Sequence, residues 1–395
     1  MDATADEEKP SPQHPRYSLW QLVRYMLGLG TWGFGGPVAL IGYMYRDLVE
    51  KRGWISESDY KEGLALAQLM PGPLAAQLSI YLGFVHYRVV GATLVGVAFV
   101  LPSFVMVVAL GALYVAYGGI GWMQAVFYGV GAAVIGIIAL SAYKLTARNI
   151  GNDKVLWAIF LASAAVTVIT KSEIVWVFLA GGVLVWLWRA PPKSFGRGAS
   201  AFGGPILASF ALGTVDWPKL GQIGTYFAYA GSFVFGSGLA IVPFLYGGVV
   251  KEYAWLTDRQ FVDAVAVAMI TPGPVVITTG FIGFLVAGFW GAVVAALATF
   301  VPCYLFTILP APYFKKYGKR PAIVAFVDGV TAAAIGAIAG AVVVIGQRSI
   351  IDWVTAALAL ATVAVLWRFK KLPEPVIVVA AALIGFIVHP LMTHP

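Results

Sequence analysis

The sequence predicts an all-helical integral membrane protein built from two similar halves of opposite orientation, with helices that are interrupted near the middle of the membrane. Three observations lead to this fold class: the composition, the recurrence of apolar runs, and the repetition of the first half by the second. Apolar residues make up 60% of the 395 positions and charged residues only 11%, whereas a soluble domain carries about 25% charged residues. So little charge cannot cover a water-facing surface, and we infer that lipid is the main solvent.

The ends of the chain and its single cysteine exclude several classes of protein. Residues 1–16 are polar and acidic, unlike a cleaved signal peptide, and we expect a disordered cytoplasmic tail. Cys303 lies within an apolar run, so neither a disulfide framework nor a metal cluster is predicted, and no cofactor is expected. The net charge is +8, but the basic residues lie in short loops between apolar runs, which indicates membrane orientation rather than nucleic-acid binding.

The apolar runs predict about 13 membrane segments, since about 20 apolar residues cross the hydrocarbon of a bilayer. Each half holds four continuous runs, namely 88–117, 122–143, 154–170 and 173–190, then 288–309, 322–345, 350–369 and 375–391. Each half begins with two runs that glycine and proline interrupt, namely 18–50 and 57–87, then 220–253 and 257–287. The weak apolar stretch 199–213 either supplies one further crossing or forms a surface loop.

The two halves align almost without gaps. A shift of 201 residues places Trp54 on Trp255 and Pro71-Gly72-Pro73 on Pro272-Gly273-Pro274, and a shift of 200 then places Pro102 on Pro302. Proline and tryptophan in one register are hard to attribute to membrane composition. The sequence therefore predicts a first repeat over 17–190, a linker over 191–219 and a second repeat over 220–395.

The basic residues predict that the repeats are inverted. They gather in alternate connections, namely 144–154, 189–197, 315–320 and 368–371. If these connections are cytoplasmic, run 88–117 leads outward whereas its mate 288–309 leads inward. The loop that carries Arg46, Lys51 and Arg52 is then external if 18–50 crosses the membrane, where nearby acids offset its charge, or internal if 18–50 is re-entrant.

Four breaks in the interrupted runs predict a binding site. They are Gly35-Gly36-Pro37, Pro71-Gly72-Pro73, Gly236-Ser237-Gly238 and Pro272-Gly273-Pro274. Proline removes a backbone donor and glycine lets the chain leave the helix, and the freed polar groups are tolerated only inside protein or along a wet cavity. Paired breaks in inverted repeats point to a midplane substrate site. For a single break, a packing kink is the ordinary alternative.

The chemistry of the breaks favours an anion. A half-helix that begins after Pro37, Pro73 or Pro274 presents free N–H groups and about half a positive charge. Four converging helix ends would total about two positive charges, which suits a dianion. Further uncharged donors are predicted at Gln77 and its repeat mate Thr278, and at Thr279 and Ser237. A tetrahedral oxyanion fits this lining.

Three acids in apolar surroundings are candidates to carry a coupled proton, namely Asp328, Glu62 and Asp263. The alternative for each is an interfacial acid paired with a loop lysine or arginine. Arg24 and Arg88 either steer an anion or extend to the membrane surface. With a negative interior, each exported negative charge gains about 2.3 kcal/mol per 100 mV, so export is favourable without coupling and uptake is not.

Two long motifs resemble a known family. The stretches 31–37 (TWGFGGP) and 70–78 (MPGPLAAQL), followed by Tyr81-Leu82-Gly83, resemble the signature of the two-domain members of the chromate ion transporter family. Phe235-Gly236-Ser237-Gly238 and Thr271-Pro272-Gly273-Pro274 resemble its second-half counterparts. The resemblance implies chromate efflux across the cell inner membrane and chromate resistance. Gly236-Ser237-Gly238 departs from a second Gly-Gly-Pro, so the two half-sites are chemically unequal.

These observations predict a secondary carrier, of the antiporter type, whose repeats rock to expose the anion to each face in turn. The motifs do not separate chromate from sulfate, so a transporter or channel for sulfate or another small inorganic anion stays open, as does a homodimer. An enzyme is not expected, because no catalytic arrangement of side chains is recognisable.

Overall fold

The computed structural model describes residues 17–34, 36–117, 121–170, 174–191, 217–234, 241–317, 320–369, 372 and 374–393. Within these ranges the regular structure is helical throughout, as predicted. The predicted tail 1–16, the stretch 199–213, Gly35 and the break Gly236-Ser237-Gly238 lie outside the described residues.

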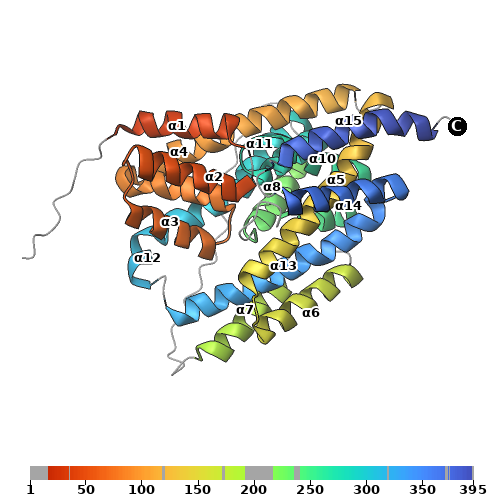
Figure 1. Ribbon diagram of the computed structural model, residues 1–395. Helices are drawn as coiled ribbons and strands as arrows, with labels where there is room; N and C mark the ends of the chain where they lie inside the picture. Colours follow the sequence, from red (N-terminus) through yellow and green to blue (C-terminus); the bar gives the residue numbers. More distant parts are fainter. Residues whose placement is uncertain are drawn as a thin grey trace, which may run out of the picture.

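The helices follow the same order in both halves (Figure 1). The first half contains α1 (Leu19–Trp32), α2 (Gly36–Met44), η1 (Tyr45–Lys51), α3 (Glu57–Leu69), α4 (Leu74–Tyr117), α5 (Gly121–Asn149), α6 (Lys154–Thr170) and α7 (Val175–Arg189). The second contains α8 (Trp217–Gly231), α9 (Ile241–Leu245), η3 (Tyr246–Glu252), α10 (Asp258–Ile270), η4 (Val275–Ile277), α11 (Thr278–Ile308), α12 (Ala311–Tyr317), α13 (Pro321–Ser349), α14 (Trp353–Arg368) and α15 (Glu374–Thr393).

Among the described residues, four helical stretches are long and apolar enough to cross a membrane, namely Leu74–Tyr117, Gln124–Asn149, Val275–Phe314 and Pro321–Gln347. The longest is not straight, because Arg88 has φ 53° and the chain folds back there. A Cβ placed on Gly83 would lie only 2.5 Å from the carbonyl oxygen of Gly91. α11 folds back in the same way at Gly288. Both turns fall at the boundaries predicted between the second and third segments of each half.

The interrupted segments of the first half are helical hairpins. α1 leads to a tip at Gly33, and α2 with η1 returns beside it. The ring of Tyr17, before α1, stacks on that of Trp54, after η1, with 5.0 Å between ring centroids. In the second hairpin α3 leads to Pro71-Gly72-Pro73 and the first part of α4 returns. The returning part ends near His86, whose Nδ1 lies 2.7 Å from the hydroxyl of Tyr17 at the base of the first hairpin. Segments 18–50 and 57–87 therefore turn back at their breaks.

Local sequence explains where the hairpin helices begin. The Ser56 hydroxyl accepts the N–H of Asp59 at the start of α3, and Thr257, its repeat mate, caps α10 by accepting the N–H of Gln260. Such side-chain acceptors satisfy the N–H groups that the first turn of a helix leaves unpaired.

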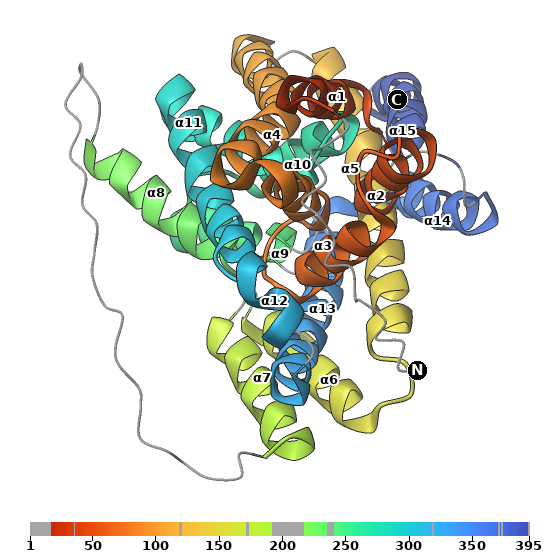
Figure 2. The ribbon, with the colours of Figure 1, turned by 90° about the vertical axis from the view of Figure 1, so that its left-hand side faces the viewer.

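The two halves interlock through their later helices. α5 packs against α14 and α15 of the second half, and α13 packs in the same way against α6 and α7 of the first (Figure 1). Glycines permit this approach: a Cβ at Gly340 on α13 would lie 2.7 Å from the carbonyl oxygen of Ala164 on α6. α1 packs on α4, α8 on α11, and α4 meets α11 between the halves (Figure 2).

Candidate functional site

The tips of the hairpins meet through two equivalent hydrogen bonds. The N–H of Gly72 donates to the carbonyl of Val234 at 2.5 Å, and the N–H of Gly273 donates to the carbonyl of Gly33 at 3.1 Å. At the repeat shift of 201, Gly72 corresponds to Gly273 and Gly33 to Val234. The same bond is thus formed twice, each time from the second hairpin of one half to the first hairpin of the other.

Both donors of this contact have to be glycine. Gly72 has φ 147° and Gly273 has φ 96°, a region that residues with a side chain rarely adopt. A Cβ on Gly72 would lie 2.6 Å from the Gln77 side chain and 2.9 Å from Cys303 Sγ. A Cβ on Gly273 would strike the Ser103 hydroxyl. The Pro-Gly-Pro breaks are therefore closely packed tips.

Ser103 and Cys303 complete the contact, and neither was predicted to belong to it. The Ser103 hydroxyl donates to the carbonyl of Pro272 at 2.7 Å, and Cys303 lies against Gly72. Both side chains are fully buried. The residues correspond at the repeat shift of 200 and each follows a matched proline, a signal that could have revealed them. A hydroxyl in one half and a thiol in the other make the half-sites chemically unequal.

The predicted side-chain donors face the backbone. Gln77 is fully buried, its Nε2 donates to the carbonyl of Pro71 at 2.8 Å, and its Oε1 has no hydrogen-bond partner among the described residues. The hydroxyls of Thr278 and Thr279 donate to carbonyls of their own turn, those of Val275 and Val276. All three side chains lie beside the tips and form bonds within the protein.

Unpaired backbone donors occur at the start of α4. The N–H of Gln77 donates to the carbonyl of Pro73 at 2.9 Å. The N–H groups of Leu74, Ala75 and Ala76 donate to no acceptor in the part of the chain that the structure describes. Such N–H groups carry the positive end of the helix dipole. In the second half the turn is tighter, because η4 follows Pro274 directly and α11 begins after it. Gly36 and Pro37 begin α2.

Two of the three candidate acids contact tyrosines of α4. The Tyr81 hydroxyl donates to Glu62 at 2.8 Å, and the Tyr114 hydroxyl donates to Asp263 at 2.7 Å. Asp263 is 3% exposed. Although the two acids are repeat mates, both partners come from the first half, so this feature does not repeat.

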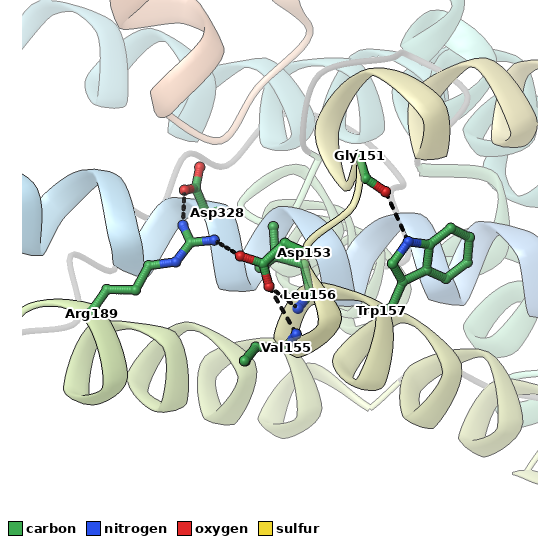
Figure 3. A network of polar contacts seen from close by, with 7 residues as sticks. All are labelled: Gly151, Asp153, Val155, Leu156, Trp157, Arg189 and Asp328. Atoms are coloured by element: carbon green, nitrogen blue, oxygen red, sulfur yellow. Dashed lines mark hydrogen bonds and ion pairs between the residues drawn. The ribbon is translucent and has the colours of Figure 1, made fainter.

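The third acid, Asp328, belongs to a network near the end of α7 (Figure 3). Arg189 lies 2.6 Å from Asp328 and 2.5 Å from Asp153. Asp328 is thus paired with an arginine, which is the alternative to proton coupling given for it in the sequence analysis. Asp153 also accepts the N–H groups of Val155 and Leu156 at the start of α6. The network ties α6, α7 and α13 together.

The loop acid of this network makes stability depend on pH. The N–H of Leu156 and the guanidinium of Arg189 lower the pKa of Asp153 by favouring its carboxylate. Its stabilising contribution is therefore complete above the unfolded pKa of about 3.9 and is lost as pH falls through the lower folded pKa. We expect Asp153→Asn to lower the melting temperature at pH 6, with the difference from wild type shrinking toward pH 3. Fluorimetric melting in detergent measures this difference.

The control for this series is Glu50→Gln, which changes an exposed acid of η1 and should follow the wild-type curve. A difference between Asp153→Asn and wild type that stayed constant from pH 6 to pH 3 would contradict the role assigned to the carboxylate.

The packing of the tips can be tested with two glycines of positive φ. Gly288, with φ 62° and ψ −153°, occupies a region nearly restricted to glycine, so Gly288→Ala should cost about 1–3 kcal/mol of stability for the backbone conformation alone, since no atom lies within 4 Å of the added methyl. Gly273→Ala adds the collision with Ser103 and should cost about 1–3 kcal/mol more. Thermal unfolding of the purified variants compares the two costs, and equal losses would mean that the tips are not closely packed.

Comparison with known proteins places the chain in a family. The chromate transporter family matches residues 20–186 and again 221–386, which confirms the predicted duplication. A chromate transport protein of Cupriavidus metallidurans is 72% identical over 383 residues, 96% of each chain. A probable chromate transport protein of Synechococcus elongatus is 62% identical over 379 residues, 95% of this chain and 96% of its own.

A chromate transport protein of Pseudomonas aeruginosa is 30% identical over 407 residues, 98% of this chain and 96% of its own. No solved structure matches the chain. The twofold family match and the nearly complete coverage of these relatives agree with the helical spans and the resemblance of the motifs. The chain therefore belongs to the chromate transporter family, whose members are multi-pass membrane transporters and not enzymes.

Proposed function

We propose that this protein is a secondary carrier that exports chromate from the cytoplasm across the cell inner membrane and so confers chromate resistance. The reciprocal bonds of Gly72 with Val234 and of Gly273 with Gly33 carry the proposal. They join the second hairpin of each half to the first hairpin of the other at two equivalent buried contacts, beside which a substrate would be enclosed by both repeats. The names of the similar proteins support chromate as the ion.

The N–H groups of Leu74, Ala75 and Ala76, which have no acceptor among the described residues, support an anionic substrate. Donors at the start of a helix bind oxyanions without a fixed positive charge. For the amide of Gln77 to contribute, it would turn so that Nε2 faces the anion in place of Oε1, at the expense of its bond to Pro71. A neutral amide can make this exchange, whereas a carboxylate in the same place would repel the substrate.

Inverted orientation of the halves is part of the proposal. The reciprocal bonds and the exchange of helices α5 and α13 between the halves fit a twofold relation between the repeats. Because the basic connections alternate along the chain, the twofold axis would lie in the plane of the membrane. The hairpins of the first half would then enter from the cytoplasm. The loop of Arg46, Lys51 and Arg52 is cytoplasmic in this arrangement, which agrees with its positive charge.

One of the three acids is proposed to carry a coupled proton. Asp263 is the strongest candidate, because it is buried on α10, the helix that leads to the second Pro-Gly-Pro break, with a tyrosine hydroxyl as its partner, whereas Asp328 is paired with Arg189. A buried carboxyl can exchange a proton only when water reaches it, which alternating exposure would allow.

Chromate flux into proteoliposomes tests the function. We expect wild-type protein to give saturable chromate uptake, and Gln77→Glu to reduce the rate at least about tenfold, because the added charge is buried without a partner. Gln222→Glu, which changes an exposed residue of α8, should retain wild-type flux. Uptake that does not saturate would indicate a channel, and equal inhibition by equimolar sulfate would favour the general anion carrier.

The coupling assignment is tested by the pH profile of the same flux. We expect Asp263→Asn to remove the dependence on an imposed pH gradient, while Asp328→Asn and Glu62→Gln retain it. A normal pH dependence in Asp263→Asn would rule that residue out.

A further inference from the structure

A cavity of about 870 Å³ lies between α1 and the returning segment of α2 and η1. Its lining extends from the base of the hairpin to its tip, and includes Arg24, Gly28, Gly33, Phe34, Arg46 and Arg52. At the tip the cavity reaches Gly33, whose carbonyl accepts the N–H of Gly273. At the base it reaches Trp54, which stacks on Tyr17. We call this cavity the α1 vestibule.

The charge of the α1 vestibule is positive. Its one acid, Asp47, lies 3.0 Å from Arg46 and 3.3 Å from Lys51, so its charge is balanced locally. Arg24 and Arg52 have no carboxylate partner among the described residues, and Arg52 lies over the rings of Tyr25 and Trp54. A cation midway along a membrane helix is costly unless it lines a wet cavity. Two uncompensated arginines along one cavity therefore favour a ligand of negative charge.

The second half does not repeat this feature. At the shift of 201, Thr225 stands for Arg24, Gly247 for Arg46 and Tyr253 for Arg52. The ring of Tyr253 stacks on Trp255 with 4.7 Å between centroids. The ring of Tyr226 fills the place where a side chain at position 248 would lie. Aromatic packing thus takes the place of these arginines at the corresponding hairpin, where the cation over the Trp255 ring is Lys219 and Lys251 lies beside Asp258.

We propose that the α1 vestibule is the loading site for the oxyanion, in which Arg24 and Arg52 attract the anion and lead it along the hairpin to the tips. The inference rests on the proposed function and adds to it the face of the membrane from which the anion enters. Because the hairpins of the two halves would open to opposite faces, the cationic entrance lies on the cytoplasmic face, with an aromatic cluster at the equivalent place on the other. Charge of one sign in a cleft raises the local concentration of an oppositely charged substrate about 10- to 1,000-fold.

Charged thiol reagents test the vestibule without any transport. Gly28 lines the cavity and has no atom within 4 Å of an added Cβ, so Gly28→Cys introduces a probe without a collision. Gly221→Cys on α8, where the added Cβ also meets no atom, is the matched control. The wild-type chain is the blank, since Cys303 is fully buried. The measurement is the ratio of labelling rates with an anionic and a cationic methanethiosulfonate.

We expect this ratio to be about tenfold higher at Gly28→Cys than at Gly221→Cys, and to fall toward the control value when Arg24→Gln or Arg52→Gln is added. Arg24→Lys keeps the charge and should keep the ratio. Added chromate should slow labelling at Gly28→Cys and leave Gly221→Cys unchanged. Equal ratios at the two positions, or no protection by chromate, would overturn the proposal. Labelling does not require flux, so the two proposals can fail separately. If Gly28→Cys shows the expected ratio and chromate protection but the protein gives no chromate flux, the carrier function is refuted and the anion site in the vestibule is not.

Discussion

The structure depends on the reciprocal hydrogen bonds between the hairpin tips. Each Pro-Gly-Pro break frees backbone groups that cannot face lipid, where an unmade hydrogen bond costs several kcal/mol, and that must be buried in protein or line a wet cavity. Gly72 and Gly273 solve this by donating to Val234 and Gly33 of the opposite half. In each of the two bonds, the donor of one half is therefore satisfied by an acceptor of the other half. The same constraint creates a buried polar contact shared by both repeats, which is what a carrier of a small anion needs.

The interlocking of the later helices decides which parts can move together. Because α5 packs on α14 and α15 while α13 packs on α6 and α7, the N-terminal and C-terminal halves are not separate packing units. We expect alternating exposure to separate the tip-bearing hairpins from this exchanged scaffold. The α1 vestibule lies within a hairpin, between α1 and η1, and reaches its tip at Gly33, so the same movement would carry its arginines together with that tip relative to the later helices.

Much of the fold could be predicted from the sequence. The composition and the apolar runs indicate which segments lie in lipid, and the repeat indicates that the two halves share one arrangement of helices. The turn at Arg88 was predicted at its place, since apolar runs end there. The contact between Pro-Gly-Pro and the opposite first break could not be predicted, because pairing between distant segments leaves no local pattern. Ser103 and Cys303 were missed for the same reason, although their alignment in the repeat gave a signal. The inward orientation of the Gln77 and Thr278 donors depends on packing, which residue type alone does not reveal.

The central claim is that an oxyanion binds at the start of α4, beside the reciprocal contacts between the hairpin tips. The most direct measurement is an anomalous difference map from chromate-soaked crystals, recorded at the chromium absorption edge. The account predicts one principal peak beside the N–H groups of Leu74, Ala75 and Ala76, enclosed by both Pro-Gly-Pro breaks. Well-occupied chromium sites found only on the outer surface or among the later helices, with none at the tips, would contradict it.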